Sequence, residues 1–247
     1  DCGMKVKIIV DASQFVHANF HIWKKAHNAA TLADAIVANI QSAVFKISQE
    51  VTVDSVVLAL DSRPTFRHQI FPGYKSRPSS GIDWDGIEVK LQENFTCLKC
   101  DLLEADDIIY IYALLKHKKD NTAVVILGSD RDHFQTVDRV GCLQYCTTSG
   151  LLPTSKESVT SWKCKLILGC KSDDVPSIAP ARTGEKTVQK MLDKGMTVKE
   201  IMLHYKIDPA GTDAQSNADL IYYDMLVYGK YVPYEDQSSL ITKINSL

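Results

Sequence analysis

Acidic residues gather in one short stretch of the sequence, "LLEADDIIYIYALL" at residues 102–115. Glu104, Asp106 and Asp107 occupy three of four consecutive positions, directly before an apolar run. One or two carboxylates at a helix N-terminus are stabilising, by about 0.3–1 kcal/mol each, because they face the positive end of the helix dipole. Three carboxylates so close together repel one another and raise one another's pKa values. The stretch therefore indicates either a charge-capped helix or a site that carboxylates share with cations.

Further carboxylates follow the predicted strands. Three short β-branched runs, "KVKIIVD", "SVVLALD" and "TAVVILGSD", end in Asp11, Asp61 and Asp130, and Asp132 lies two residues beyond the last of them. One Asp after a strand is an ordinary turn residue. Ligands of open parallel sheets, however, bind at the carboxyl ends of the strands, near the topological switch point. Three strands that all end in Asp favour a shared site at that edge.

With Asp173 and Asp174 added, eight or more carboxylates are candidates for this one site. Such a concentration of negative charge requires divalent cations, and hard oxygen ligands without histidine favour Mg²⁺ or Mn²⁺. Two ions roughly 3.5–4 Å apart suit phosphodiester hydrolysis, because one activates water and the other stabilises the leaving oxygen. The predicted cofactor is therefore Mg²⁺, with Mn²⁺ able to substitute, in two or more ions.

The elements that must position these side chains alternate between strand and helix over the first two-thirds of the chain. This order predicts an α/β fold with a central, mostly parallel sheet flanked by helices. After about Pro153 the predicted elements are helices, in "SWKCKLILGC", "GEKTVQKMLDK" and "NADLIYYDMLVYG". We expect a catalytic core over residues 1–155 and a helical lobe over residues 156–247.

A basic segment lies between the second strand and the acidic stretch. Residues 62–82 contain no Asp or Glu. A basic stretch beside acidic clusters suggests a polyanion held near metal ions, although a solvated loop explains this segment equally well. Its basic residues are Arg63, Arg67, Lys75 and Arg77, interleaved with the rings of Phe66, Phe71 and Tyr74.

The composition is that of a soluble globular protein, with 45% apolar residues, 23% charged residues and a net charge of −2. Seven cysteines in irregular spacing favour reduced thiols and a cytoplasmic protein. Buried free thiols are a better interpretation of Cys97, Cys100, Cys142 and Cys146 than a zinc site. We expect neither a signal peptide nor a membrane span.

The order of the motifs resembles the flap endonuclease, or 5′-nuclease, family over about residues 5–200. The motifs are Asp11, "LALD", "FRHQIFPGYKSR", "EADDI", "GSDRDHFQ" and "LGCKSDDVPSI…GEKT". Within the family, "DWDG" and "YYDMLVYGKYVPYE" look most like the ribonuclease H of T-even bacteriophages. The resemblance implies a PIN-like core and a helix–three-turn–helix DNA-binding motif in the helical lobe. It also implies 5′→3′ exonuclease and flap endonuclease activity, with removal of RNA primers.

The resemblance also implies roles for individual residues. The expected metal ligands are Asp11, Asp61, Glu104, Asp106, Asp107, Asp130, Asp132 and Asp173, with Asp174 as a partial substitute. Lys75 matches the lysine that reaches the scissile phosphate, and Arg77 lies one residue from the position of the family's arginine. The expected DNA contacts are Arg67 and Tyr74 in the basic segment and Arg182, Gly184, Lys186 and Thr187 in the hairpin.

Three departures from the family pattern affect these expectations. Cys170 stands where the family has a metal-site Asp, and Asp174 stands where it has Asn. A thiolate is a poor ligand for Mg²⁺, so the second metal is expected to bind more weakly. Gly184 alone remains of the two glycines expected in the hairpin. The chain after Arg77 is short, which predicts a short arch within residues 62–95 and leaves the threading of long flaps open.

We therefore expect a Mg²⁺-dependent, monomeric 5′ nuclease that acts on branched, nicked or 5′-flapped DNA and on RNA–DNA hybrids. A single-strand-binding protein or a polymerase is the expected protein partner, and the host cytoplasm the expected location for a phage protein. The alternative is a DNA-junction-binding protein whose catalysis is weak or absent because of Cys170. A PIN-type single-strand ribonuclease would share the core but not the "GEKT" lobe. An Asp-nucleophile phosphatase is disfavoured, because "DASQ" lacks the second Asp.

Overall fold

The structure is a computed structural model that describes residues 3–23, 29–152 and 159–247. The chain folds into two compact units, each described here by itself. Unit 1 comprises Asp1–Arg63, Ser79–Leu152 and Val232–Leu247, and unit 2 comprises Pro64–Pro78 and Pro153–Tyr231. The boundary expected at residue 155 falls outside the described residues. The catalytic and DNA-binding roles of the two expected domains stay predictions.

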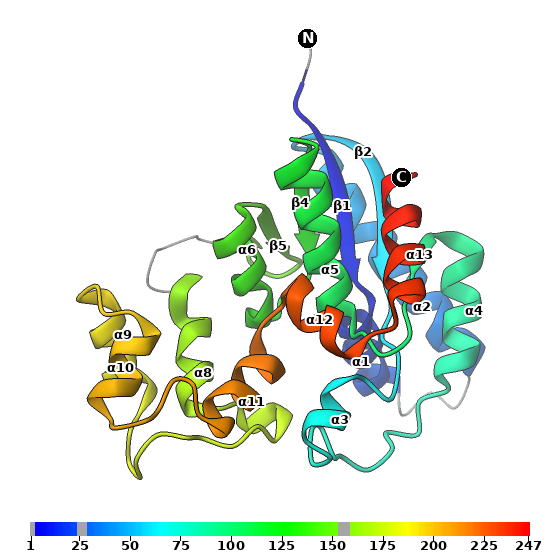
Figure 1. Cartoon of the computed structure of the whole chain (residues 1–247). Coiled ribbons are helices and arrows are strands. Elements are labelled where there is room, and N and C mark those ends of the chain that lie inside the picture. Colours follow the sequence, from blue (N-terminus) through cyan, green and yellow to red (C-terminus); the bar gives the residue numbers. More distant parts are fainter. Residues whose placement is uncertain (1–2, 24–28, 153–158) are drawn as a thin grey trace. The chain divides into compact units, whose positions relative to one another are not determined.

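Unit 1 contains all the strands of the described residues and the helices that cover them (Figure 1). The strands are β1 (Lys5–Asp11), β2 (Thr52–Ala59), β3 (Thr96–Leu98), β4 (Ala123–Leu127), β5 (Leu143–Cys146) and β6 (Gly150–Leu151). The helices are α1 (Ala12–Trp23), α2 (Ala29–Ser48), α4 (Trp84–Asn94), α5 (Ala105–Ala113), α6 (Phe134–Val140) and α13 (Tyr234–Asn245). A π-helical turn, η1 (Leu114–Lys119), extends α5, and a 3-10 turn, η2 (Arg131–His133), precedes α6.

The six strands form one sheet in the order β3-β2-β1-β4-β5-β6. All neighbours are parallel except β5 and β6. The chain moves outward from β1 to β2 and β3, then returns to β4 on the other side of β1, so the topological switch point lies between β1 and β4. The register pairs Asp11 with Ala59 and Val10 with Leu127. The carboxyl ends of β1, β2 and β4 therefore meet at one edge, and the predicted fold class is confirmed.

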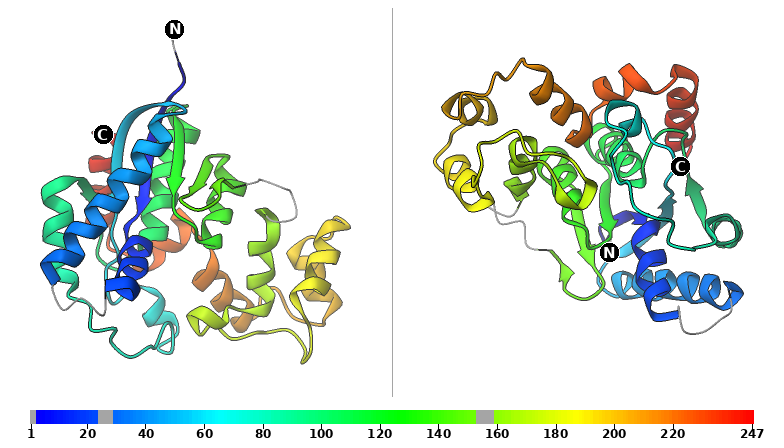
Figure 2. Two further views of the ribbon diagram at one scale, coloured as in Figure 1. Left: turned by 180° about the vertical axis from the view of Figure 1, so that it is seen from behind. Right: turned by 90° about the horizontal axis from the view of Figure 1, so that it is seen from below.

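Helices cover both faces of this sheet, which explains why the strands are continuous apolar runs instead of alternating ones. Figure 1 shows α5, α6 and α13 on one face, and the view from behind in Figure 2 shows α2 and α4 on the other. Val6, Ile8 and Val10 of β1 pack against Ile36 and Ile40 of α2 in the main core of the unit. A rigid sheet buried on both faces gives the side chains at its edge fixed positions.

Unit 2 is helical. Its elements are α3 (Arg67–Ile70), η3 (Ser161–Cys164), α8 (Lys165–Leu168), η4 (Lys171–Asp173), α9 (Glu185–Asp193), α10 (Val198–His204), α11 (Thr212–Ile221) and α12 (Met225–Tyr231). One cluster of buried residues gathers around Trp162, Leu166 and Leu220, and a second around Ile167 and Ile201. Among the described residues, no helix is both long enough and apolar enough to cross a membrane.

The single helix predicted for "NADLIYYDMLVYG" is wrong, because the structure divides it into α11 and α12. Tyr222 is extended (φ −69°, ψ 132°), which ends α11. The side chain of Asp224 then accepts the N–H of Leu226 at 2.8 Å, as an N-cap residue does. Asp inside an apolar run was the available signal for this break. The helix–three-turn–helix motif expected in this unit stays a prediction.

Candidate metal centre

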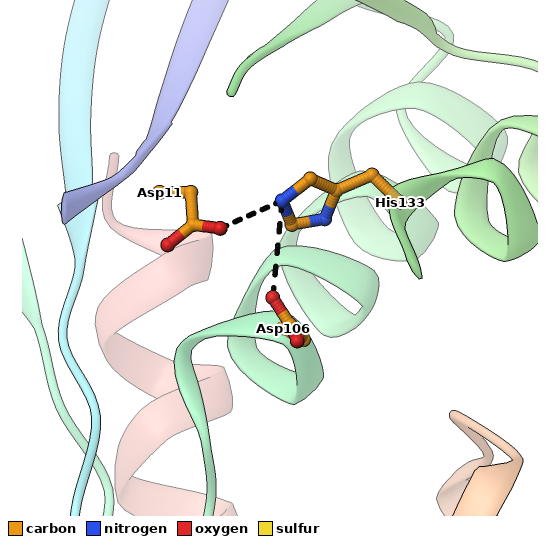
Figure 3. A group of neighbouring side chains, drawn as sticks. All are labelled: Asp11, Asp106 and His133. Atoms are coloured by element: carbon orange, nitrogen blue, oxygen red, sulfur yellow. Dashed lines mark hydrogen bonds and ion pairs between the residues drawn. The ribbon is translucent and has the colours of Figure 1, made fainter. Parts of the chain in front are cut away.

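The centre of the site is a group of three side chains from three elements of unit 1 (Figure 3). Asp11 is the last residue of β1, Asp106 lies in the first turn of α5, and His133 ends η2. His133 Nε2 lies 2.8 Å from Asp11 Oδ2 and 3.8 Å from Asp106 Oδ1. One ligand atom from each residue lies within 4.8 Å of the others. In the described part of the chain, this is the one group of three or more metal-binding side chains.

Asp61 lies beside this group, two residues beyond the end of β2. Its Oδ1 accepts the N–H of Ala105 at 2.6 Å, at the start of α5, and the hydroxyl of Ser13 donates to its Oδ2. Burial raises the pKa of Asp61, and the carboxylates of Glu104 and Asp11 raise it further, while these two hydrogen bonds lower it. The carboxylates thus share a space of low dielectric constant, where a bound cation would relieve their repulsion.

The residues of the acidic stretch have different surroundings, and one of them caps a helix as the first interpretation predicts. Asp107 is fully buried, and its Oδ2 accepts the N–H of Glu104 at 2.9 Å, which caps the start of α5. Asp106 instead reaches the group of Asp11 and His133. The predicted role of Asp107 as a metal ligand therefore stays a prediction beside an observed capping role.

The loop after β4 is held by side chains from two other elements. Gln144 of β5 donates both amide hydrogens, one to the carbonyl of Gly128 and one to that of Asp130, each at 2.9 Å. Gln14 of α1 accepts the N–H of Ser129 at 2.6 Å. A Cβ atom on Gly128 would lie 2.8 Å from Gln14 Oε1 and 3.1 Å from Asp11 Cβ, so a side chain there would displace Gln14 from its hydrogen bond. These contacts fix the backbone that carries the exposed Asp130.

His133 was not among the predicted site residues, because the sequence pattern favoured oxygen ligands without histidine. It is fully buried. Burial alone would lower its pKa, but the hydrogen bond to Asp11 and the charges of Asp106, Asp11 and Asp130 raise the pKa to about 9. Its Nδ1 has no hydrogen-bond partner in the part of the chain that the structure describes. Its position directly after the predicted ligand Asp132, in "SDRDHFQ", was the feature of the sequence that could have placed it near the site.

Unit 2 brings the two predicted catalytic residues of positive charge to the loop that carries Asp173. Lys75 Nζ lies 3.8 Å from Asp173 Oδ1, and the backbone N–H of Lys75 donates to the Asp173 carbonyl at 3.0 Å. The guanidinium of Arg77 donates to the carbonyl of Ser172. Asp174 follows in the left-handed region (φ 60°). The roles of these residues in catalysis or metal binding stay predictions.

Cys170 begins the same loop. Its side chain is buried, and its Sγ lies 3.0 Å from the hydroxyl of Ser172. Its backbone exchanges two hydrogen bonds with Val175, at 3.0 and 2.9 Å, in an isolated antiparallel bridge. Cys170 thus closes the turn that presents Asp173 and Asp174.

The predicted DNA-binding residues divide into exposed and buried ones. Gly184 precedes the first turn of α9, and the predicted residues Arg182, Lys186 and Thr187 around it are exposed, as is the acidic Glu185. Tyr74 is buried. Arg67 is also buried: its Nε donates to the carbonyl of Leu220 at 2.8 Å and its guanidinium lies 4.5 Å from the centre of the Phe66 ring. The structure therefore gives Arg67 a packing role and adds no support for a DNA contact.

The cysteines agree with the prediction of buried free thiols. Cys97, Cys100, Cys142 and Cys146 are all free and buried, and burial raises the pKa of Cys142 to about 12. In the described part of the chain, no cysteine joins a group of three metal-binding side chains. Cys2 lies outside the described residues.

A mostly parallel sheet, covered by helices on both faces and with a group of carboxylates at its carboxyl edge, defines the class of α/β proteins. The sequence model of the family described as "5′-3′ exonuclease, N-terminal resolvase-like domain" matches residues 6–163, and the chain belongs to this family. It is 26% identical over 196 residues to DNA polymerase I of Borreliella burgdorferi, covering 71% of this chain and 21% of that protein. It is 29% identical over 156 residues to a 5′-3′ exonuclease of Mycoplasma pneumoniae, covering 58% and 53%. The chain thus spans about a fifth to a half of the curated relatives it matches.

Solved structures share the fold along the whole chain. A mutant of the bacteriophage T5 5′-exonuclease is 16% identical, covers 98% of both chains and has a TM-score of 0.70. A complex of the bacteriophage T5 flap endonuclease with DNA and metal ions has the same identity and coverage and a TM-score of 0.69. The likeness supports the PIN-like fold. The closer resemblance to the ribonuclease H of T-even bacteriophages stays a prediction.

Proposed function

We propose that this chain is a divalent-metal-dependent 5′ nuclease that hydrolyses phosphodiester bonds at nicks and 5′ flaps in DNA and in RNA–DNA hybrids. The observation that carries the proposal is the position of Asp11, Asp61, Asp106 and Glu104. These carboxylates come from the ends of β1 and β2 and from the start of α5, at the edge of the sheet where ligands of such folds bind. Membership of the 5′-3′ exonuclease family supports it independently.

The donor atoms fit Mg²⁺ or Mn²⁺, because carboxylate oxygens are the ligands these ions prefer. Asp11 and Asp106 would hold the first ion, with Asp61 and Glu104 beside them. When bound, the ions would activate water and neutralise charge on the phosphate. The raised pKa of Asp61 supports this fit, because burial and then the charges of Glu104 and Asp11 disfavour its ionised form, which a bound cation would stabilise.

The chain's own residues position this group before any substrate arrives. The N–H of Ala105 and the hydroxyl of Ser13 orient Asp61 from both sides. Gln144 and Gln14 hold the loop that carries Asp130. Ligands fixed by packing and by such hydrogen bonds need little rearrangement in order to bind metal.

In unit 2, the exposed start of α9 is the proposed DNA contact. Backbone N–H groups at a helix N-terminus bind phosphate well, and Arg182 and Lys186 add positive charge there. Lys75 and Arg77 are the proposed catalytic cations: Lys75 would reach the scissile phosphate and stabilise the negative charge that develops there. The affinity for DNA should fall steeply as the salt concentration rises, since contacts with phosphate dominate such binding. Action as a monomer, together with a polymerase or single-strand-binding protein, belongs to the same proposal.

Cleavage of a 5′-labelled flap and a nicked duplex, with Mg²⁺, Mn²⁺ or EDTA, tests the proposal. Short labelled fragments should appear with either metal and be absent with EDTA. Asp130→Asn should abolish the reaction, while Asp85→Asn, a change at an exposed residue of α4, should leave it intact. Full cleavage by Asp130→Asn at saturating Mg²⁺ would refute the assignment.

Cys170 favours a second candidate, a protein that binds DNA junctions with little turnover. A buried thiol that contacts Ser172 offers no hard ligand where the family pattern has a carboxylate. Binding of a flap without cleavage in Mn²⁺, together with a large rate increase on Cys170→Asp, would support this function. Efficient cleavage by the wild type would exclude it.

A further inference from the structure

We propose that His133 Nε2 is a ligand of the metal centre, so that the site binds late first-row divalent ions such as Co²⁺ and Zn²⁺ through mixed nitrogen and oxygen donors. The inference rests on the proposed function only in so far as both concern the same site. A histidine ligand would extend the expected metals to Co²⁺ and Zn²⁺, because the carboxylates by themselves define a site for Mg²⁺ or Mn²⁺.

The spacing of the three side chains fits shared coordination. Metal–nitrogen and metal–oxygen bonds of about 2.0–2.2 Å place neighbouring ligand atoms about 3.0–3.4 Å apart in octahedral or tetrahedral geometry. His133 Nε2 lies 2.8 Å from the Asp11 oxygen and 3.8 Å from the Asp106 oxygen. These separations bracket the expected value, so shifts of a few tenths of an ångström would complete the arrangement.

Rigid elements hold the side chains of Asp11, Asp106 and His133 in place. Its members come from a central strand, a buried helix and a 3-10 turn. Asp11 and His133 are almost completely buried, whereas the Asp106 side chain is 17% exposed, so ions reach the group from the side of Asp106. A metal ion on Nε2 would displace the proton that this atom shares with Asp11, and two carboxylates with one neutral imidazole then balance the charge of a divalent cation.

A site that includes the His133 imidazole should prefer different metal ions from a site made of carboxylates alone. Imidazole suits Zn²⁺ and neighbouring transition metals, and affinity at nitrogen-containing sites rises along the first row from Mn²⁺ through Co²⁺. Mg²⁺ retains its preference for oxygen. A His133 that only donates a hydrogen bond to Asp11 would instead affect all these ions to the same extent.

The direct test is the electron spin echo of the wild-type protein loaded with Mn²⁺. An imidazole nitrogen bound to Mn²⁺ modulates the echo at ¹⁴N frequencies, and this readout requires neither catalysis nor a variant. We expect strong ¹⁴N modulation in the wild type and its loss in His133→Gln. An echo without directly bound nitrogen in the wild type would overturn the inference.

Calorimetric titration of the metal-free protein provides the second test. Gln places an amide N–H near the position of Nε2, so His133→Gln keeps a donor to Asp11 but loses the nitrogen ligand. Affinity for Zn²⁺ and Co²⁺ should fall at least tenfold, in the range of about 10–100-fold seen when the surroundings of a metal site are disturbed. Affinity for Mg²⁺ should change much less. His204→Gln, at an exposed residue of α10, is the matched control.

The outcomes separate the inference from the proposed function. Equal losses for Zn²⁺ and Mg²⁺ in His133→Gln, with cleavage of flaps by the wild type, would refute the histidine ligand and leave the nuclease assignment intact. If the wild type binds Mn²⁺ through nitrogen but cleaves no substrate, His133 is confirmed as a metal ligand and the nuclease assignment is refuted.

Discussion

Gly169→Ala should destabilise unit 2 strongly, because two independent features of the structure exclude a side chain there. Gly169 follows α8 with φ 67° and ψ −163°, a region of backbone conformation that is essentially restricted to glycine. A Cβ atom would also lie 2.3 Å from the carbonyl oxygen of Val175 and 2.5 Å from that of Pro176. Both contacts are with backbone, so the loop itself would have to move.

The size of the loss in stability follows from these two features. A residue forced into a sparsely populated backbone region costs about 1–3 kcal/mol. Moving the loop breaks the bridge between Cys170 and Val175, whose two hydrogen bonds measure 3.0 and 2.9 Å. Each such bond contributes a net stability of about 1 kcal/mol. The free energy of unfolding of unit 2 should therefore fall by about 3–5 kcal/mol.

Urea unfolding followed by the fluorescence of Trp162 measures this loss. Trp162 is buried in the same cluster as Cys170 and Val175, so it reports on unit 2. The other two tryptophans of the chain, Trp23 and Trp84, are replaced by Phe in both proteins that are compared. With a slope of about 2 kcal/mol per molar urea, the midpoint should fall by about 2 M.

Gly229→Ala is the matched control. Gly229 lies inside α12, also in unit 2, and a Cβ atom there meets nothing within 4 Å. Alanine is more favourable than glycine in a helix by up to about 1 kcal/mol, so the midpoint should stay the same or rise. If Gly169→Ala unfolds at the same urea concentration as Gly229→Ala, the reasoning about this loop is wrong.

Three further predictions concern unit 1. Gln144→Leu removes both amide donors to the loop of residues 128–130, so metal affinity measured by calorimetry should fall about 10–100-fold, whereas an unchanged affinity would exclude this positioning role. Asp107→Ala removes an N-terminal cap and should lower the free energy of unfolding by about 0.5–2 kcal/mol, while Asp107→Asn, which keeps an acceptor, should lower it less. For Cys146, burial raises the pKa, but hydrogen bonds from the following turn outweigh burial and lower it to about 7. Its alkylation, followed by mass spectrometry, should therefore be half-maximal near pH 7, while Cys142, whose pKa is about 12, should react far more slowly. Equal rates at both cysteines would contradict this.

Much of the fold of unit 1 was predictable from local sequence. The run "KVKIIVD" predicts a strand at residues 5–11, where β1 lies, because β-branched residues favour strands and buried parallel strands read as continuous apolar runs. The Asp residues after three such strands predicted a site at one edge, since parallel strands present their carboxyl ends together. The structure does bring Asp11 and Asp61 to that edge.

Other features depend on contacts between residues far apart in the chain, so no local pattern reveals them. Arg67 resembles a surface residue in a basic segment, yet it is buried because its guanidinium reaches a carbonyl 153 residues away. His133 joins Asp11 across 122 residues, which only the pairing of β1 with β4 makes possible. The sequence by itself therefore determined the strands and the kinds of side chain that follow them. Tertiary structure decided which of those side chains meet, because strand register and burial are set by the packing of the whole unit.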